Sequence, residues 1–335
     1  MRIKILLIFT VISLTFNGQN ENGLVNWMTF KEAQLKNKTA PKPFLVDIYT
    51  DWCGWCKHMM KTTYSNSGFA TYINQNFYPV KFNAEGKDTI EYNGKTYLPT
   101  SKEPKTPHQL AIKFLGSSLT YPSTVFITNN YEFNLLTQGY LDEKKIEPLL
   151  IFTVENVYRT TQYEDFSDRF TKTFYDTVFP KKQIKTYSIQ EALKLSEKKP
   201  KKILVNITAN FCNSCKVQTK TTFVDTSIAN YIEKHFYFVN FDAESTDTVV
   251  YKQQKHFKQI INGYPLHSLS HKLTNGRLLL PSLAVLDEKG DVLEALSIYQ
   301  HPKNLKPVLI YFGNDIYKKK KWTDFITEYM KPKNN

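Results

Sequence analysis

The sequence repeats itself after 159 residues, and this repeat constrains the fold more than any other feature. The shift brings two Cys-x-x-Cys pairs into register, together with aromatic, acidic and proline positions around them. The matched positions are Cys53, Cys56 and Lys57 with Cys212, Cys215 and Lys216, Phe77 and Tyr78 with Phe236 and Tyr237, Ala84 and Glu85 with Ala243 and Glu244, His108 with His267, Pro122 and Ser123 with Pro281 and Ser282, and Pro148 with Pro307. One offset without a gap predicts a tandem duplication. A chain of 335 residues is long enough for two separate cores.

The same order of elements is predicted in each copy. An amphipathic helix comes first, over residues 28–36 in the first copy and after the N-cap residue Ser188 in the second. A buried strand then leads into a helix that opens with the Cys-x-x-Cys pair. The later elements are a helix (67–76 or 226–235), a strand (77–82 or 236–241), a polar insertion, two strands (124–128 and 135–138, or 283–286 and 292–295) and a closing helix from about 143 or 302.

Two cysteines on the first turn of a helix, directly after a buried strand, indicate redox chemistry. The helix N-terminus favours the thiolate of the first cysteine. That thiolate attacks a substrate disulfide, and the second cysteine resolves the mixed disulfide. We therefore expect Cys53 and Cys212 to be exposed nucleophiles, and Cys56 and Cys215 to be buried resolving thiols. All four cysteines belong to these pairs, so none is left for a structural disulfide.

The stretch Trp52-Cys53-Gly54-Trp55-Cys56-Lys57, followed by Tyr121-Pro122-Ser123, resembles the thioredoxin-like family. The resemblance implies an α/β fold of two tandem thioredoxin-like domains, each a central mixed β-sheet flanked by helices. It also implies cis peptide bonds before Pro122 and Pro281. The backbone of Tyr121 and Leu280 is then expected to bind an extended substrate, beside an apolar rim that includes Trp52 and Trp55.

The two copies differ where protons are handled. Thioredoxins carry a buried aspartate six residues before the first cysteine and a lysine on the next strand, and Asp47 and Lys81 match these positions. A buried carboxylate has a raised pKa and can accept the proton of the resolving thiol. The second copy has Asn206 and Asn240 there. We therefore expect the first copy to be the main catalytic unit, and the second to react more slowly.

The predicted function is that of an exported thiol-disulfide oxidoreductase acting on protein or peptide disulfides and thiols, with an unidentified redox partner. The alternative is a non-catalytic binding module that holds extended or unfolded partners, especially through the second domain. We expect no cofactor. We also expect no metal, because zinc ribbons space their cysteine pairs by about 15–20 residues, far less than the separation of the two pairs here.

The N-terminus predicts export. Arg2 and Lys4 precede an apolar run over residues 5–16 and a polar exit, which is the pattern of a secretory signal. The run is shorter than the roughly 20 residues of a spanning helix, so no membrane span is expected in the mature chain. The predicted domains are a signal peptide (1–19), thioredoxin-like domain 1 (22–171), a linker (172–184) and thioredoxin-like domain 2 (185–335). We expect a periplasmic or secreted protein.

Charge and the remaining motifs indicate ordinary structural roles. The net charge of +13 comes from scattered lysines, which favours a solvated, lysine-rich surface. We expect no nucleic-acid partner. Each copy ends in an apolar stripe at helical spacing, expected to pack on its own domain, with partner docking as the alternative. The stripes are Tyr163, Phe166 and Phe170, and Trp322, Phe325 and Tyr329. His108 and His267 are expected to have a packing role.

Overall fold

The computed structural model describes residues 23–176, 183–261 and 263–331. The predicted signal peptide (1–19) lies outside the described residues, and the predicted linker (172–184) is described only at its two ends. The chain divides into two compact units, residues 1–143 and 144–335, called here the first and second unit.

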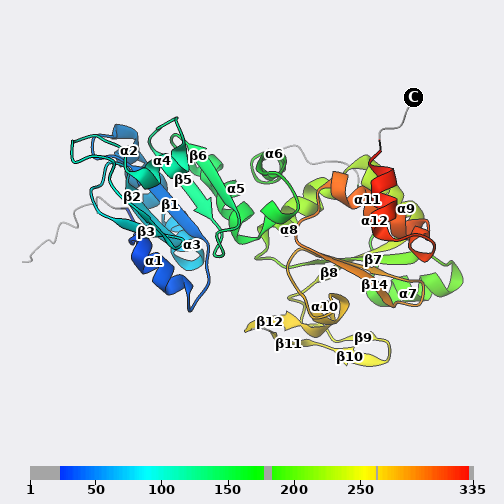
Figure 1. The fold of residues 1–335 in the computed structure, drawn as a ribbon. Helices are drawn as coiled ribbons and strands as arrows, with labels where there is room; N and C mark the ends of the chain where they lie inside the picture. Colours follow the sequence, from blue (N-terminus) through cyan, green and yellow to red (C-terminus); the bar gives the residue numbers. More distant parts are fainter. Residues whose placement is uncertain (1–22, 177–182, 262, 332–335) are drawn as a thin grey trace, which may run out of the picture. The chain divides into compact units, whose positions relative to one another are not determined.

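The first unit contains a four-stranded mixed sheet in the order β2-β1-β5-β6 (Figure 1). The central strand β1 runs parallel to β2 and antiparallel to β5, and β6 pairs antiparallel with β5. The strands of this sheet are β1 (Phe44–Tyr49), β2 (Tyr78–Asn83), β5 (Ser123–Ile127) and β6 (Asn134–Gln138). The flanking elements are α1 (Phe30–Asn37), α2 (Gly54–Lys61), η1 (Thr63–Ser65), α3 (Ser67–Asn76), the hairpin β3 (Ile90–Tyr92) and β4 (Lys95–Tyr97), and α4 (Gln109–Leu115).

The central strand β1 is buried on both faces, which explains its nearly continuous apolar sequence. Side chains alternate between the two faces of a strand. Phe44, Val46 and Ile48 therefore share one face and belong to one apolar core. Asp47 lies on the other face, with Leu45, and is 1% exposed. The sheet thus places one acidic side chain inside the protein.

The second unit contains a sheet with the same strand directions, in the order β14-β13-β7-β8. Its strands are β7 (Lys202–Thr208), β8 (Phe236–Asp242), β13 (Ser282–Leu286) and β14 (Val292–Ser297). The helical elements are α5 (Glu143–Val154), η2 (Val157–Arg159), α6 (Tyr163–Phe174), α7 (Ile189–Lys198), α8 (Asn213–Val217), η3 (Gln218–Thr222), α9 (Thr226–His235), α10 (Ser268–Leu273), α11 (Pro302–Gly313), η4 (Ile316–Lys318) and α12 (Trp322–Tyr329). Two hairpins complete the unit, β9 (Val249–Tyr251) with β10 (Gln254–His256), and β11 (Lys258–Ile261) with β12 (Tyr264–His267).

The predicted fold class is confirmed: two mixed α/β sheets flanked by helices occur in tandem. The predicted strands and helices are present with ends shifted by one or two residues, and Ser188 caps α7 through a capping box with Glu191. The polar insertions contain hairpins and short helices that were not predicted. In the second copy, the cysteine helix α8 changes into the π-helical segment η3 after five residues.

The two terminal stripes pack differently. Phe325 of α12 lies 5.2 Å from Tyr311 of α11, ring centre to ring centre, so this helix packs on its own domain as predicted. The same prediction for α6 was wrong. Phe166 is fully buried and contacts Tyr299 of the second copy at 5.5 Å, as well as Phe152 of its own copy. An amphipathic pattern fixes which helix face is buried, but not which surface covers it.

Candidate redox sites

The first cysteine pair lies at the start of α2, directly after β1. Cys53 is the N-cap residue, and its Sγ accepts a hydrogen bond from the Cys56 backbone N–H at 3.1 Å. The two sulfur atoms form a disulfide. Cys212 and Cys215 form the matching disulfide at the start of α8, with the same N-cap bond of 3.1 Å. Both predicted pairs are therefore brought together.

The prediction of exposed first cysteines was wrong for this disulfide form. Cys53 is 4% exposed and Cys212 is 3% exposed, close to Cys56 at 4% and Cys215 at 2%. The disulfide holds each first sulfur against the start of its own helix, where the backbone N–H of the second cysteine points at it. Burial therefore does not distinguish nucleophile from resolving cysteine in the oxidised protein.

An apolar rim surrounds the first disulfide. Trp52 and Trp55 are 57% and 62% exposed. The Trp52 ring packs edge-on against Tyr121 at 6.1 Å, and its Nε1–H donates to Glu85 at 3.0 Å. Trp55 contacts Tyr140 at 5.6 Å. Aromatic side chains fixed in this way offer large contact areas at low cost in conformational entropy.

The second site has a different rim. Phe211 replaces Trp52 and is 58% exposed, while Ser214 replaces Trp55 and is fully buried. Leu280 packs against the cluster formed by Ala209, Cys212 and Cys215. The peptide bonds before Pro122 and Pro281 are both cis, which confirms that expectation.

Asp47 and Lys81 lie opposite each other on the parallel strands β1 and β2. Burial raises the pKa of Asp47 to about 7, and the positive charge of Lys81 opposes this rise. Neither carboxyl oxygen has a hydrogen-bond partner among the described residues. Burial lowers the pKa of Lys81, whose Nζ lies 5.0 Å from the centre of the Tyr49 ring. Asp47 can therefore gain or lose a proton near neutral pH.

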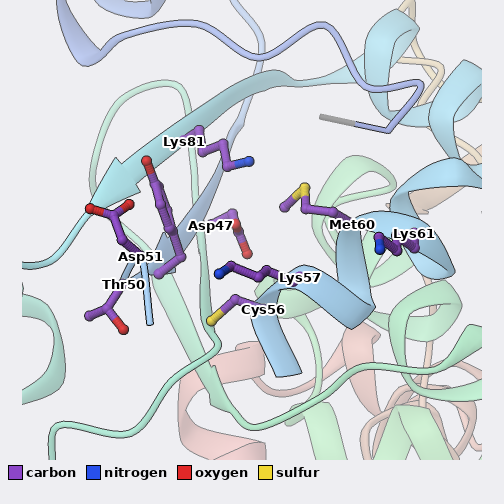
Figure 2. A pocket seen from close by; sticks show the side chains of 9 residues that line it. Asp47, Thr50, Asp51, Cys56, Lys57, Met60, Lys61 and Lys81 are labelled. Atoms are coloured by element: carbon purple, nitrogen blue, oxygen red, sulfur yellow. The ribbon is translucent and has the colours of Figure 1, made fainter. Parts of the chain in front are cut away.

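Asp47 and Cys56 line the same cavity, which has a volume of about 410 Å³. Figure 2 shows the Asp47 carboxyl group pointing from its strand toward the helix that carries Cys56 and Lys57. Lys81 lines the cavity from the neighbouring strand. A polar cavity of this size has room for water, and water there can carry a proton between the resolving cysteine and the buried carboxylate.

The second copy replaces this acid-base pair by a chain of neutral amides. The Asn206 Nδ2 group donates to Asn240 Oδ1 at 3.0 Å, and Gln218 Nε2 donates to Asn206 Oδ1 at 3.2 Å. Gln218 Oε1 in turn accepts from the Gln300 backbone N–H at 2.7 Å. Gln218 stands where the first copy has Met59, and we did not identify it from the sequence. These three side chains contain no group that titrates near neutral pH.

A second missed residue is Glu155, which follows α5 in the first copy. Its Oε1 accepts from the Asn213 backbone N–H at 3.0 Å, and its Oε2 accepts from the Ser214 N–H at 2.7 Å. Oε2 also accepts from the Ser214 hydroxyl group and lies 3.8 Å from Cys212 Sγ. Burial raises the pKa of Glu155, and these hydrogen bonds oppose the rise. No motif links residues 57 positions apart, so only the fold identifies this contact.

The two histidines of the insertions cap helices. His108 Nδ1 accepts from the Leu110 N–H at 3.1 Å, and its Nε2 contacts the Asp88 carbonyl oxygen at 3.0 Å. His267 makes the same two contacts with Leu269 and Asp247. Both are fully buried, which confirms their structural role.

The comparisons with known proteins identify both copies. Residues 13–172 match the family model Thioredox_DsbH, described as a protein of unknown function, DUF255. Residues 184–270 match the model Thioredoxin_7, described as thioredoxin-like. The chain therefore contains two thioredoxin-like regions in tandem. This thioredoxin-like protein therefore carries two Cys-x-x-Cys pairs in disulfide geometry.

Three solved structures illustrate what the thioredoxin-like chain is similar to. A thioredoxin-fold protein from Helicobacter pylori has 16% identity, with 48% of this chain and 88% of that chain covered, at a TM-score of 0.30. A disulphide isomerase from Xylella fastidiosa Temecula1 has 16% identity, with 42% and 99% covered, at a TM-score of 0.27. The DsbH oxidoreductase has 18% identity, with 34% and 72% covered, at a TM-score of 0.25.

No curated protein matches the thioredoxin-like chain. In the part of the chain that the structure describes, every helix is too short or too polar to cross a membrane.

Proposed function

We propose that this protein is a thiol-disulfide oxidoreductase that exchanges disulfides with protein or peptide substrates, mainly through its first cysteine pair. One observation carries the proposal. The Cys53–Cys56 disulfide lies at a helix start, and Cys56 shares a cavity with a buried carboxylate whose pKa is about 7. A group with this pKa can act as a general base or acid at neutral pH.

The reaction begins with the reduced first pair. The Cys53 thiolate attacks one sulfur of a substrate disulfide, a mixed disulfide forms, and the other substrate sulfur leaves and takes up a proton. Asp47 accepts the proton of the Cys56 thiol through the shared cavity. The Cys56 thiolate then attacks Cys53 Sγ and releases the second substrate sulfur as a thiolate, which takes up a proton. Two electrons pass from the protein dithiol to the substrate, and the reverse steps oxidise a substrate dithiol.

The rim of the first site supports a peptide or protein substrate. Trp52, Trp55 and Tyr121 surround the disulfide with aromatic surface, and the two tryptophans are more than half exposed. Apolar side chains flanking a cysteine of an unfolded or extended chain can pack on such a surface. A redox partner that restores the starting oxidation state acts on the same disulfide.

The proposed location is outside the cytoplasm, in the periplasm or the surrounding medium. The basic start and the apolar run over residues 5–16 support it, since they match a secretory signal. Fractionation of cells that express the tagged chain tests this point, and recovery of the protein in the cytoplasmic fraction alone contradicts it.

The catalytic proposal is tested by reduction of a model protein disulfide with dithiothreitol as the electron donor. We expect Cys53→Ser to abolish most of the turnover, because it removes the attacking thiolate. The matched control is Cys212→Ser, which makes the same change in the second copy and should retain most of the turnover. Full turnover by the double variant Cys53→Ser, Cys56→Ser contradicts the proposal.

A second candidate function is the binding of extended partners by the second copy. The neutral chain from Asn240 through Asn206 to Gln218 favours it, because an amide takes the place that the base Asp47 has in the first copy. We expect a reduced, unfolded model protein to bind the variant that carries Cys53→Ser and Cys56→Ser. Binding should weaken when Phe211 of this variant is also replaced by serine. Equal binding with and without Phe211→Ser contradicts this function.

A further inference from the structure

Glu155 places a carboxylate on the second redox site. It comes from the end of the first copy, yet it receives three hydrogen bonds from Asn213 and Ser214, the residues between Cys212 and Cys215. Three donors fix the position of the carboxylate, with Oε2 at 3.8 Å from Cys212 Sγ. The sulfur that should act as nucleophile therefore faces a fixed acidic group.

The carboxylate opposes formation of the Cys212 thiolate in two ways. A negative charge at this distance disfavours a second negative charge on the sulfur. The carboxylate also accepts two N–H groups at the start of α8, those of Asn213 and Ser214, which would otherwise help to stabilise a thiolate; the Cys215 N–H alone points at Cys212 Sγ among the described residues. When the disulfide is reduced, the Cys212 S–H group can donate to Oε2, which further stabilises the thiol over the thiolate.

The hydrogen bonds from Asn213 and Ser214 favour the ionised form of Glu155, against the burial that raises its pKa. Lys216 is the cation that acts on the Glu155 carboxyl group, and its Nζ lies 3.4 Å from Asn213 Oδ1. On α6, Arg169 and Asp165 act on Tyr299 and His301. On η3, Lys220 Nζ donates to the Thr173 carbonyl oxygen.

We propose that Glu155 is a positioning residue of the second redox site, where it holds Cys212 as the thiol and restrains its attack on disulfides. The inference rests on the proposed thiol-disulfide function and deepens it. The end of the first copy thereby regulates the reactivity of the second cysteine pair. We expect the second pair to react slowly for two separate reasons, since Asn206 also stands where the first copy has the base Asp47.

The test measures the pKa of the Cys212 thiol in the reduced chain carrying Cys53→Ser and Cys56→Ser. Alkylation by iodoacetamide is followed against pH, and fragment masses report modification of Cys212 and Cys215 separately. We expect Glu155→Gln to lower the pKa of Cys212 by about 1–3 units. The alkylation rate at pH 7 should then rise about threefold for each unit, because a more acidic thiol is also a weaker nucleophile. The matched control is Glu164→Gln, an exposed glutamate on α6.

The pH profile separates this role from a structural one. If Glu155→Gln only loosens the site, Cys212 reacts faster at every pH and its pKa stays the same, which overturns the proposal. If Glu155→Gln does not fold, Glu155→Asp carries the test, because it withdraws the charge by one methylene. A smaller fall in the pKa is then expected, and an unchanged pKa overturns the proposal.

The measurement does not depend on turnover. A shifted Cys212 pKa in a chain that reduces no substrate supports the role of Glu155 and contradicts the proposed function. Full turnover with an unshifted pKa supports the proposed function and contradicts the role of Glu155.

Discussion

Replacing Asp47 by asparagine should make the first unit more stable and less active. The folded protein raises the pKa of this carboxyl group from 3.8 to about 7, chiefly through burial. A shift of roughly three units at 1.36 kcal/mol per unit corresponds to about 4 kcal/mol. Asp47 is 1% exposed, so solvent screening does not reduce this value. The ionised aspartate therefore destabilises the fold, and asparagine removes that cost.

The sign of the pH dependence follows from proton binding. Between pH 4 and pH 7 the folded protein holds the Asp47 proton and the unfolded chain does not. The free energy of unfolding of the wild type therefore falls as the pH rises through this range, and the loss is complete above about pH 7. The Asp47→Asn variant has no carboxyl group at this position, so its free energy of unfolding does not fall for this reason. We expect its stability advantage to be small at pH 4 and about 4 kcal/mol at pH 8.

The assay is unfolding by urea at several pH values, with both disulfides oxidised. Tryptophan fluorescence reports mainly on the first unit, because Trp27, Trp52 and Trp55 lie there and Trp322 lies in the second. In parallel, the resolution of a mixed disulfide at Cys53 should slow about 10²-fold, since its general base is lost. A stability difference that does not change with pH, or an unchanged rate of resolution, would refute the reasoning.

Three further predictions concern stability. Phe166→Ala should destabilise the second unit by about 3–5 kcal/mol, because the ring is fully buried against Tyr299. Hydrogen exchange locates the loss. Phe174→Ala, at a position 36% exposed, is the control, and an effect confined to the first unit contradicts the packing. Asn206→Asp buries a carboxylate opposite Asn240, where the first copy has Lys81, so the loss of stability in urea should be larger at pH 8 than at pH 4. An equal loss of stability at pH 4 and pH 8 contradicts the burial of this carboxylate. His108→Ala should lower the free energy of unfolding by about 0.5–2 kcal/mol, measured by urea unfolding, because α4 loses its N-cap. Unchanged stability contradicts the capping role.

Local sequence patterns determined the elements and their order. The apolar run of β1 and the N-cap at Ser188 act over a few residues, so their positions are visible in the sequence. The 159-residue offset then predicted the elements of the second copy from those of the first. The chemistry of the pairs also followed from local spacing, because Cys53 and Cys56 share one helical turn whatever surrounds them. Asp47 and Lys81 were identified through the resemblance to thioredoxins, and they lie opposite each other on β1 and β2.

Only the tertiary structure decided which surfaces meet. The stripe of α6 predicts a buried face, but its contact with Tyr299 depends on a surface that is distant in the sequence. Gln218 and Glu155 could not be identified from the sequence for the same reason. Polar side chains carry no periodic signal, and the partner of Gln218 lies 12 positions away and that of Glu155 lies 57 positions away. The sequence thus determined which atoms can do redox chemistry. The fold determined which charges act on those atoms, because electrostatic interactions depend on distance in space and not on separation along the chain.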